Sequence, residues 1–324
     1  MTGSSVGTVK IVPAGELRAA ITPADLVEPM REAFTALSDG RFRTTFSLLD
    51  LDDGDVHIKA SSELGGPLYV VKLASWVESN ARRGRPGGSG AIVVCSAETG
   101  APLTLLVDEH YLTDARTAAA GALATDLLAP AGSSSVAVLG AGVQARLQVR
   151  TLAALRKVEQ VVVWARRADA AAALVTDLEA GLDGARVTAA ATARQAVESA
   201  DIVITATASP APLVEAEWLR AGQHITALGA DDDRKRELTT ACFSRADLVV
   251  VDSRAQSGRT AELREALAAG AVRERHIAEL GEVLAGRATG RQSGDEITIA
   301  KLTGVAAQDL AAARAVLDRL GSAA

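Results

Sequence analysis

Apolar residues in the second half of the chain occur in short continuous runs, separated by alanine-rich stretches with helical periodicity. Strands covered by helices on both faces have this pattern, because neither side of such a strand meets water. Regular alternation of such strands with helices predicts an α/β fold with a doubly wound parallel sheet. The five apolar runs are residues 136–139, 161–164, 202–204, 225–228 and 248–251.

The first half of the chain has a different pattern. A helical pattern covers about residues 23–37, and apolar and polar residues alternate at 55–59 and 68–72. Alternation with a period of two is typical of strands with one buried face. A glycine-rich loop is expected at 84–90, followed by an apolar strand at 91–95. This half is predicted to be a mixed α+β domain built on an open sheet.

These patterns divide the chain into a mixed domain, residues 1–125, and a parallel-sheet domain, residues 126–304. After a break at Gly304, an amphipathic helix is expected within residues 305–324, packing back onto the first domain. The 324 residues and 48% hydrophobic content provide enough apolar material for two cores.

The charge balance restricts the classes of partner. The formal net charge is −6, whereas nucleic acids and membrane surfaces are bound by clusters of uncompensated lysine and arginine. Residues 1–10 lack the apolar segment of an export signal, and no stretch approaches the about 18 uncharged apolar residues of a membrane span. We expect a cytoplasmic protein whose partners are small molecules and other subunits, with neither nucleic acid nor membrane among them.

The cysteines and histidines do not indicate a metal. Cys95 and Cys242 have neither disulfide-framework nor metal-ligand spacing. The four histidines are scattered singly, which is typical of satisfied core or surface residues. No GxSxG nucleophile elbow is present either, so a hydrolase is not supported.

A dinucleotide-binding loop is predicted where the first apolar run of the second half ends. The run leads into Gly140-Ala141-Gly142-Val143-Gln144-Ala145 and then a helical pattern. The first glycine permits a tight turn, the second lets the backbone approach a pyrophosphate, and the alanine permits close helix–sheet packing. A bare GxGxxA is weak evidence, but here it lies in the strand–turn–helix context that Rossmann domains require.

The end of the second strand bears on the choice of cofactor. NAD sites usually have an acidic residue there for the ribose 2′-hydroxyl, whereas this chain has Arg166 and Arg167. An arginine accommodates a 2′-phosphate, so NADP is favoured, and NAD stays open because the two arginines also fit a solvated strand end. Thr205, Thr207 and Gly229 are further candidates for cofactor contacts.

Several motifs together resemble the ornithine cyclodeaminase and mu-crystallin family over essentially the whole chain. They are YLTDARTAAAG at 111–121, GAGVQAR at 140–146, GQHITALGAD at 222–231 with Lys235 and Glu237, and DEITIAKLTG at 295–304. Within the family the chain most resembles the ectoine-utilisation, cyclodeaminase-like branch. The resemblance implies a homodimer in which the N-terminal half and the C-terminal helix form the substrate-binding and dimerisation domain.

The resemblance also assigns roles to single residues. It implies that Lys72 faces the substrate and that Arg116 binds the substrate carboxylate. Asp231 would handle the proton of the amine or imine. The pyrophosphate would lie on Gly140, Gly142 and Gln144, with Thr117 beside the cofactor.

Two departures from the family pattern matter. In the family, an arginine upstream of these residues binds the substrate carboxylate. The corresponding position in this chain is near Leu49, which is not an arginine, unless Arg43 takes over this role from a shifted strand. The acidic residue at the second strand end, which cyclodeaminases use to hold NAD, is missing, and this argues against cyclodeaminase activity.

The residues themselves fit hydride transfer to an imine, which needs a cation for the carboxylate and a proton source. Alternation places Lys72 on the face of Leu68 and Val70, although a solvated edge lysine is the alternative. Lys59 has a similar setting, and if both lysines face the cleft the substrate could carry a second carboxylate.

Arg116 and Asp231 also have simpler interpretations. Arg116 offers a planar fork for a carboxylate, or it forms an ordinary helix-start ion pair with Asp114. Asp231 follows a strand at its carboxyl end, where doubly wound sheets bind ligands, but three consecutive aspartates also fit a solvated loop.

The sequence therefore leaves three functions open. The first is an NAD(P)-dependent oxidoreductase that reduces a small α-imino acid to an amino acid, or runs the reverse reaction. The second is an ornithine or lysine cyclodeaminase that recycles NAD and releases ammonia. The third is a catalytically silent cofactor-binding protein.

Overall fold

The computed structural model describes residues 8–321, which form two compact units. The open-sheet unit contains the residues up to Arg116 and those from Val305, and the parallel-sheet unit runs from Thr117 to Gly304. This boundary lies earlier than the one expected near residue 125, and both positions fall inside helix α4 (Tyr111–Leu128). Residues 1–7, where no export signal is expected, lie outside the described part of the chain, as do 322–324 of the expected C-terminal helix.

The open-sheet unit is built on a six-stranded sheet in the order β1-β6-β5-β4-β3-β2. β1 is parallel to β6, and the other neighbouring strands are antiparallel. The strands are β1 (Lys10–Pro13), β2 (Phe42–Leu51), β3 (Gly54–Glu63), β4 (Leu68–Val77), β5 (Gly88–Ser96) and β6 (Pro102–Val107). The helices are α1 (Ala14–Ala20), η1 (Ala24–Leu26), α2 (Val27–Ser38), α3 (Ser79–Arg82) and α12 (Ala306–Arg319).

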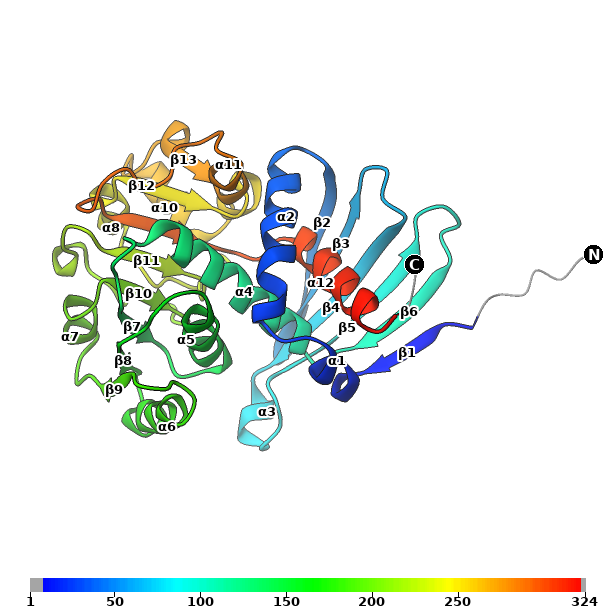
Figure 1. The fold of residues 1–324 in the computed structure, drawn as a ribbon, viewed down its shortest axis with the longest axis horizontal. Coiled ribbons are helices and arrows are strands. Elements are labelled where there is room, and N and C mark those ends of the chain that lie inside the picture. Colours follow the sequence, from blue (N-terminus) through cyan, green and yellow to red (C-terminus); the bar gives the residue numbers. More distant parts are fainter. Residues whose placement is uncertain (1–7, 322–324) are drawn as a thin grey trace, which may run out of the picture. The chain divides into compact units, whose positions relative to one another are not determined.

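Helix α12 covers one face of this sheet, packing against β2, β3, β4 and β5, with α2 beside it (Figure 1). Its apolar stripe follows helical spacing, so that Ala306, Leu310, Ala313 and Leu317 are buried. In β4 the residues facing this helix are buried and those between them are more exposed, as period-two alternation predicts.

One local expectation for this unit is wrong. Residues 84–90 were expected to form a loop, but β5 already begins at Gly88. A Cβ on Gly90 would lie 2.7 Å from the Leu73 carbonyl oxygen of β4. The glycine therefore permits a close approach of two paired strands rather than a turn.

The parallel-sheet unit has eight parallel strands in the order β13-β12-β14-β11-β10-β7-β8-β9. The strands are β7 (Ser135–Leu139), β8 (Gln160–Trp164), β9 (Arg186–Ala189), β10 (Ile202–Thr205), β11 (His224–Ala227), β12 (Leu248–Val251), β13 (Ile277–Glu279) and β14 (Thr298–Lys301). The helices are α5 (Val143–Leu155), α6 (Ala168–Glu179), α7 (Ala193–Glu198), η2 (Ala216–Trp218), α8 (Thr240–Arg245), α9 (Arg254–Ser257), α10 (Ala261–Ala268), η3 (Glu274–His276) and α11 (Leu280–Leu284).

The strand order of this unit defines where a ligand is expected. From β7 the chain proceeds to β8 and β9 on one side and then returns to β10 on the other side of β7. The carboxyl ends of β7 and β10 therefore flank a topological switch point, where open α/β sheets bind their ligands. The α/β class with a doubly wound parallel sheet and a second mixed unit is confirmed. Within residues 8–321, no helix has the length and apolarity that a membrane crossing requires.

Candidate active site

A buried ionic cluster lies where α12 crosses the open sheet. Lys72 of β4 places its Nζ 2.8 Å from Oδ1 of Asp309, and Nε of Arg116 is 3.3 Å from the same oxygen. All three side chains are almost completely buried. Oε1 of Gln308 accepts a further hydrogen bond of 3.2 Å from Arg116. Two cations thus share one carboxylate.

The simpler interpretations of Lys72 and Arg116 do not hold. β4 lies inside the sheet between β3 and β5, so Lys72 is not a solvated edge lysine. Arg116 pairs with Asp309, and His110 is the residue whose Nδ1 lies 3.2 Å from Asp114. Burial is the largest influence on the pKa of Lys72 and lowers it, which is opposed by Asp309 and reinforced by Arg116.

Lys59 belongs to the same face of the sheet, whereas Arg43 does not. Lys59 is paired directly with Lys72 across β3 and β4 and with Phe46 across β2 and β3, and its Nζ lies 5.4 Å from the Phe46 ring centroid. Arg43 is three positions from Phe46 on the exposed edge strand, so strand alternation directs it to the opposite face. The structure therefore brings Lys59 near Lys72 and leaves Arg43 apart from both.

Asp309 was not singled out from the sequence, although its position contained a signal. It lies between Ala306 and Ala313 on the buried face of α12. A carboxylate on the apolar face of an amphipathic helix needs a buried partner, because an unpaired buried charge is costly. The partner could not be identified from the sequence, since Lys72 is 237 positions away.

In the parallel-sheet unit, the glycine loop has the geometry of a pyrophosphate site. Gly140 has φ of 124°, and a Cβ on it would lie 2.5 Å from the Ala206 carbonyl oxygen. A Cβ on Gly142 would meet no atom within 4 Å, so the backbone there is open to a ligand. Gly142 is the residue before the first turn of α5, which begins at Val143 and presents its amino end to this open space. These residues fit a dinucleotide.

Two further predicted cofactor residues are joined by a side chain that the sequence did not single out. The amide Nε2 of Gln148 donates to the carbonyl oxygen of Thr117 at 3.0 Å and to Oε1 of Gln144 at 3.3 Å. Gly121 of α4 has no Cβ where the Gln148 amide crosses, and a Cβ there would overlap it. Gln148 therefore fixes α4 to the start of α5, beside the glycine loop.

Arg166 and Arg167, which are predicted to select the cofactor, follow strand β8. Gly140 N donates to the carbonyl oxygen of Trp164 at 2.8 Å, so the ends of β7 and β8 are joined. Arg166 and Arg167 come directly after β8 and are exposed, and the nearest carboxylate to Arg167 is Asp169 at 3.9 Å. The residues that follow β8 directly are thus an alanine and two arginines, with no acidic residue before Asp169.

Asp231 lies beyond the carboxyl end of β11 and forms an ion pair. Its Oδ1 is 2.7 Å from Nζ of Lys235, which also lies 3.2 Å from Oδ2 of Asp232. Burial lowers the pKa of Lys235, but Asp231 and Asp232 outweigh it, so the pKa lies above its ordinary value. Oδ1 of Asp232 also accepts hydrogen bonds from the backbone N–H groups of Arg234 and Lys235. The three aspartates are thus a structured turn rather than a freely solvated loop.

Thr205, Thr207 and Gly229 surround Glu237. This buried carboxylate accepts hydrogen bonds from Oγ1 of Thr205 at 2.7 Å and from the backbone N–H and Oγ1 of Thr207 at 2.7 and 2.9 Å. Gly229 N donates to it at 2.8 Å. These polar groups, predicted to contact the cofactor, are engaged by a protein carboxylate, and a direct contact with the cofactor stays a prediction. Glu237 belongs to the family motif but had been given no role.

A second buried pair holds the other side of the same loop. Nζ of Lys301 lies 2.6 Å from Oε2 of Glu262 and donates at 2.6 Å to the carbonyl oxygen of Ala230, directly before Asp231. Oε1 of Glu262 accepts the backbone N–H groups of Glu237 and Leu238 at 2.6 and 2.5 Å. The Asp231 loop is therefore fixed at both of its ends by buried charges.

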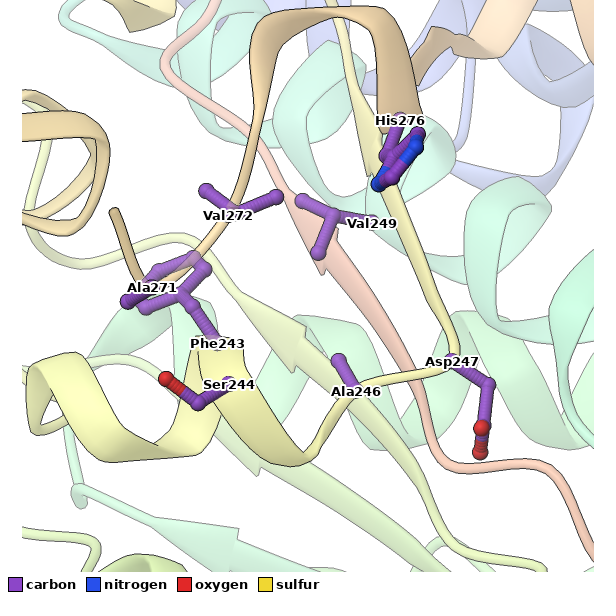
Figure 2. A pocket seen from close by; sticks show the side chains of 8 residues that line it. All are labelled: Phe243, Ser244, Ala246, Asp247, Val249, Ala271, Val272 and His276. Atoms are coloured by element: carbon purple, nitrogen blue, oxygen red, sulfur yellow. The ribbon is translucent and has the colours of Figure 1, made fainter.

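The hollow in Figure 2 lies at the amino ends of strands in the parallel sheet. It measures about 520 Å³ and is lined by residues that include Asp247, Val249 and His276. Asp247 and His276 directly precede β12 and β13, whereas the glycine loop and Asp231 follow β7 and β11. Since all these strands are parallel, the hollow does not belong to the candidate site. Among residues 8–321 no group of histidine, cysteine and acidic side chains is arranged to hold a metal.

The sequence pattern of the ornithine cyclodeaminase/mu-crystallin family matches residues 11–324. The chain belongs to this family. The family resemblance inferred from the motifs is confirmed, whereas its placement in the ectoine-utilisation branch is not specifically supported.

Family members with similar sequences include both cyclodeaminases and reductases by name. An uncharacterized cyclodeaminase of Sinorhizobium fredii is 42% identical, covering 96% of each chain. A Δ1-pyrroline-2-carboxylate reductase of Paracoccus denitrificans is 34% identical, covering 91% of this chain and 92% of the relative. The iminosuccinate reductase of the same organism is 31% identical, covering 95% of each.

Two solved structures have the same fold as this chain. The Δ1-pyrroline-2-carboxylate reductase of Thermococcus litoralis, in complex with NADH and L-proline, has a TM-score of 0.90 and 29% identity, covering 96% of this chain and 97% of that chain. An archaeal alanine dehydrogenase dimer with bound NAD has a TM-score of 0.89 and 30% identity, covering 97% of this chain and 96% of that chain.

Proposed function

We propose that this protein is an NAD(P)-dependent oxidoreductase that reduces a small α-imino acid to the amino acid, or runs the reverse reaction. The observation that carries the proposal is that Lys72 and Arg116 are buried cations that share the carboxylate of Asp309. The glycine loop of the second unit, whose geometry fits a dinucleotide, supports it. The names of two relatives support it, since both describe reductases of carboxylate-bearing imines.

The proposed roles follow from side-chain chemistry. Arg116 and Lys72 bind the substrate carboxylate, because a guanidinium and an ammonium together provide several directed N–H donors. Asp231 takes up a proton from water and passes it to the nitrogen, and Lys235 holds its carboxylate in place. Gly140, Gly142 and Gln144 hold the pyrophosphate. A nicotinamide held there would supply a hydride to the imine carbon, which together with the proton at nitrogen would convert C=N to CH–NH.

We propose NADP rather than NAD as the preferred cofactor. Arg166 and Arg167 are exposed at the end of β8, and a planar guanidinium suits a 2′-phosphate. NAD is the alternative, because two similar structures contain bound NADH or NAD.

We also propose a homodimer formed through the uncovered face of the open sheet. Leu49, Leu51 and Leu73 share this face and are 52, 43 and 45% exposed. An exposed apolar sheet face of this kind is typical of an interaction surface. The archaeal alanine dehydrogenase is a dimer. The ectoine-utilisation branch and a cytoplasmic location remain proposals based on the sequence.

The test is reductive amination by the purified protein. NADPH or NADH is mixed with ammonium and one of oxaloacetate, pyruvate or glyoxylate, and the absorbance of the reduced nicotinamide is followed. We expect the reduced cofactor to be consumed in the presence of at least one of these oxo acids. A preference for oxaloacetate would support a second carboxylate on the substrate, bound by Lys59, and equal rates with pyruvate would count against it.

A cyclodeaminase is the second candidate, favoured by the relative of that name at 42% identity. It predicts NAD⁺ that stays bound through purification and ammonia release from ornithine or lysine without added cofactor. These two results, together with no activity in the oxo-acid assay, would replace the reductase proposal.

A further inference from the structure

The carboxylate of Asp309 is the centre of the cluster that contains Lys72 and Arg116. Its Oδ1 lies 2.8 Å from the lysine Nζ and 3.3 Å from the arginine Nε. Its Oδ2 has no hydrogen-bond partner among the described residues, and the side chain is 1% exposed. The negative charge of Asp309 is thus directed to these two cations.

Without Asp309, the two cations would be adjacent, buried and mutually repelling. A buried ammonium is disfavoured by desolvation and by a neighbouring positive charge, and is favoured by a neighbouring carboxylate. A lysine responds by losing its proton, which an arginine does not do in proteins. The protonation of Lys72 is therefore the property that is sensitive to Asp309.

We propose that Asp309 is a positioning residue for substrate binding: it holds Lys72 and Arg116 side by side and supplies the negative charge that keeps Lys72 an ammonium at neutral pH. This inference rests on the proposed function, in which these two cations bind the substrate carboxylate. Asp309 itself is not assigned a contact with substrate.

The other charged groups around Lys72 do not replace Asp309. Arg116 from α4 disfavours the ammonium, and Lys59 on β3 adds another positive charge beside it. Asp108, which follows β6, favours the ammonium less than Asp309 does. Its carboxylate accepts the backbone N–H groups of Leu112 at 3.0 Å and His110 at 3.3 Å.

The pKa directions agree with this geometry. Burial alone would raise the pKa of Asp309, but Lys72 and Arg116 outweigh it and hold the pKa below its ordinary value. The carboxylate therefore stays ionised at neutral pH. Burial lowers the pKa of Lys72 even with Asp309 present, so removal of this charge would lower it further.

The test compares Asp309→Asn with Asp318→Asn, which makes the same substitution on the exposed part of α12. The chain has six lysines, so ¹³C labelling at lysine Cε gives few NMR signals, and Lys72→Met identifies the signal of Lys72. In Asp309→Asn we expect the pKa of Lys72 to fall by about 1 to 3 units. In Asp318→Asn it should not change.

Kinetics supply the second measurement. The basic limb of kcat/KM against pH should move to lower pH in Asp309→Asn by the same interval, with the main effect on KM, because binding is lost as Lys72 deprotonates. A limb and a Lys72 titration that match the wild type would overturn the proposal. A purely structural role would lower activity at all pH values without moving the limb.

Two further outcomes are distinguishable. If the wild type reduces no imine, the proposed function fails, while the Lys72 titration still tests whether Asp309 maintains its charge. If Asp309→Asn does not fold, Asp309→Glu keeps the charge and should leave the pKa of Lys72 near the wild-type value, with a raised KM. A large fall in that pKa despite the retained carboxylate would contradict the proposal.

Discussion

Nζ of Lys72 and Oδ1 of Asp309 lie 2.8 Å apart although 237 positions separate the two residues in the chain. The contact joins a central strand of the open sheet to the first turn of the last helix. The cation environment of the open-sheet unit is therefore completed only by the end of the chain.

Replacement of Asp231 by asparagine should reduce kcat by about 10²-fold or more, because the proposed proton donor is lost. Lys235 would keep Asp232 as a partner at 3.2 Å, so we expect the loop to stay folded and NADPH to bind with unchanged affinity. Steady-state rates and cofactor fluorescence measure the two quantities. The exposed neighbour Asp233→Asn is the control, and unchanged turnover in Asp231→Asn would remove this residue from the mechanism.

Replacement of both Arg166 and Arg167 by alanine should weaken NADPH binding about tenfold or more and leave NADH binding nearly unchanged, because only NADPH has the 2′-phosphate that these cations would bind. Titrations with each cofactor, monitored by fluorescence, give the ratio of the two dissociation constants. Arg194→Ala removes an exposed arginine elsewhere in the unit and serves as the control. Equal weakening of both cofactors would speak against a 2′-phosphate site.

Replacement of Lys301 by methionine should destabilise the parallel-sheet unit by about 3–5 kcal/mol, because Glu262 would be left buried without its partner. Urea unfolding, followed by the fluorescence of Trp164 and Trp218, measures the change. Lys157→Met removes the lysine of an exposed pair and should leave the midpoint unchanged. The double variant Lys301→Met with Glu262→Gln should recover part of the loss, and its failure to do so would assign the effect to packing alone.

The buried His224 should make the free energy of unfolding depend on pH. The imidazole is fully buried, with Nδ1 and Nε2 each 2.8 Å from a threonine hydroxyl, and burial lowers its pKa to about 3. The unfolded chain, with an ordinary histidine pKa, binds more protons between about pH 3 and 6.5, so stability falls as the pH falls through this window. The slope from this group is roughly 1.4 kcal/mol per pH unit.

His224→Gln should have a shallower decline of stability between pH 6 and 4 than the wild type, whatever its stability at pH 7. Urea midpoints across this range provide the comparison, and the exposed His276→Gln should retain the wild-type slope. Identical slopes in all three proteins would show that other groups govern acid stability.

Leu73→Glu should shift the protein from dimer to monomer, because it places a charge in the centre of the uncovered sheet face. Sedimentation velocity measures the distribution at several concentrations. Leu64 is 51% exposed but lies outside the strands, so Leu64→Glu is a matched control that should leave the dimer intact. A Leu73→Glu protein that remains dimeric would place the interface elsewhere.

Patterns confined to one element were sufficient to predict most of the fold. Continuous apolar runs predicted β7, β8, β10, β11 and β12, because strands buried on both faces need apolar side chains throughout. β14 was not recognised as a strand, and its place between β11 and β12 depends on pairing with residues fifty or more positions away. Local sequence does not encode such pairing.

The same distinction applies to the site. The tight turn at Gly140 and the open backbone at Gly142 were predictable, because both depend only on the local conformation of one turn. The burial of Lys72 was predictable from alternation, but its partner was not. The engagement of Thr205 and Thr207 by Glu237 joins residues about thirty positions apart, and only the folded chain shows that the carboxylate lies among them.

The exposed position of Arg166 and Arg167 has an evolutionary consequence. Substitutions at exposed sites without a packing role usually change stability little, and neither arginine belongs to the buried charge networks that hold the Asp231 loop. If these arginines select the cofactor as proposed, descendants of this protein can exchange one dinucleotide for the other by point mutation, while the charge networks that hold the Asp231 loop are inherited unchanged.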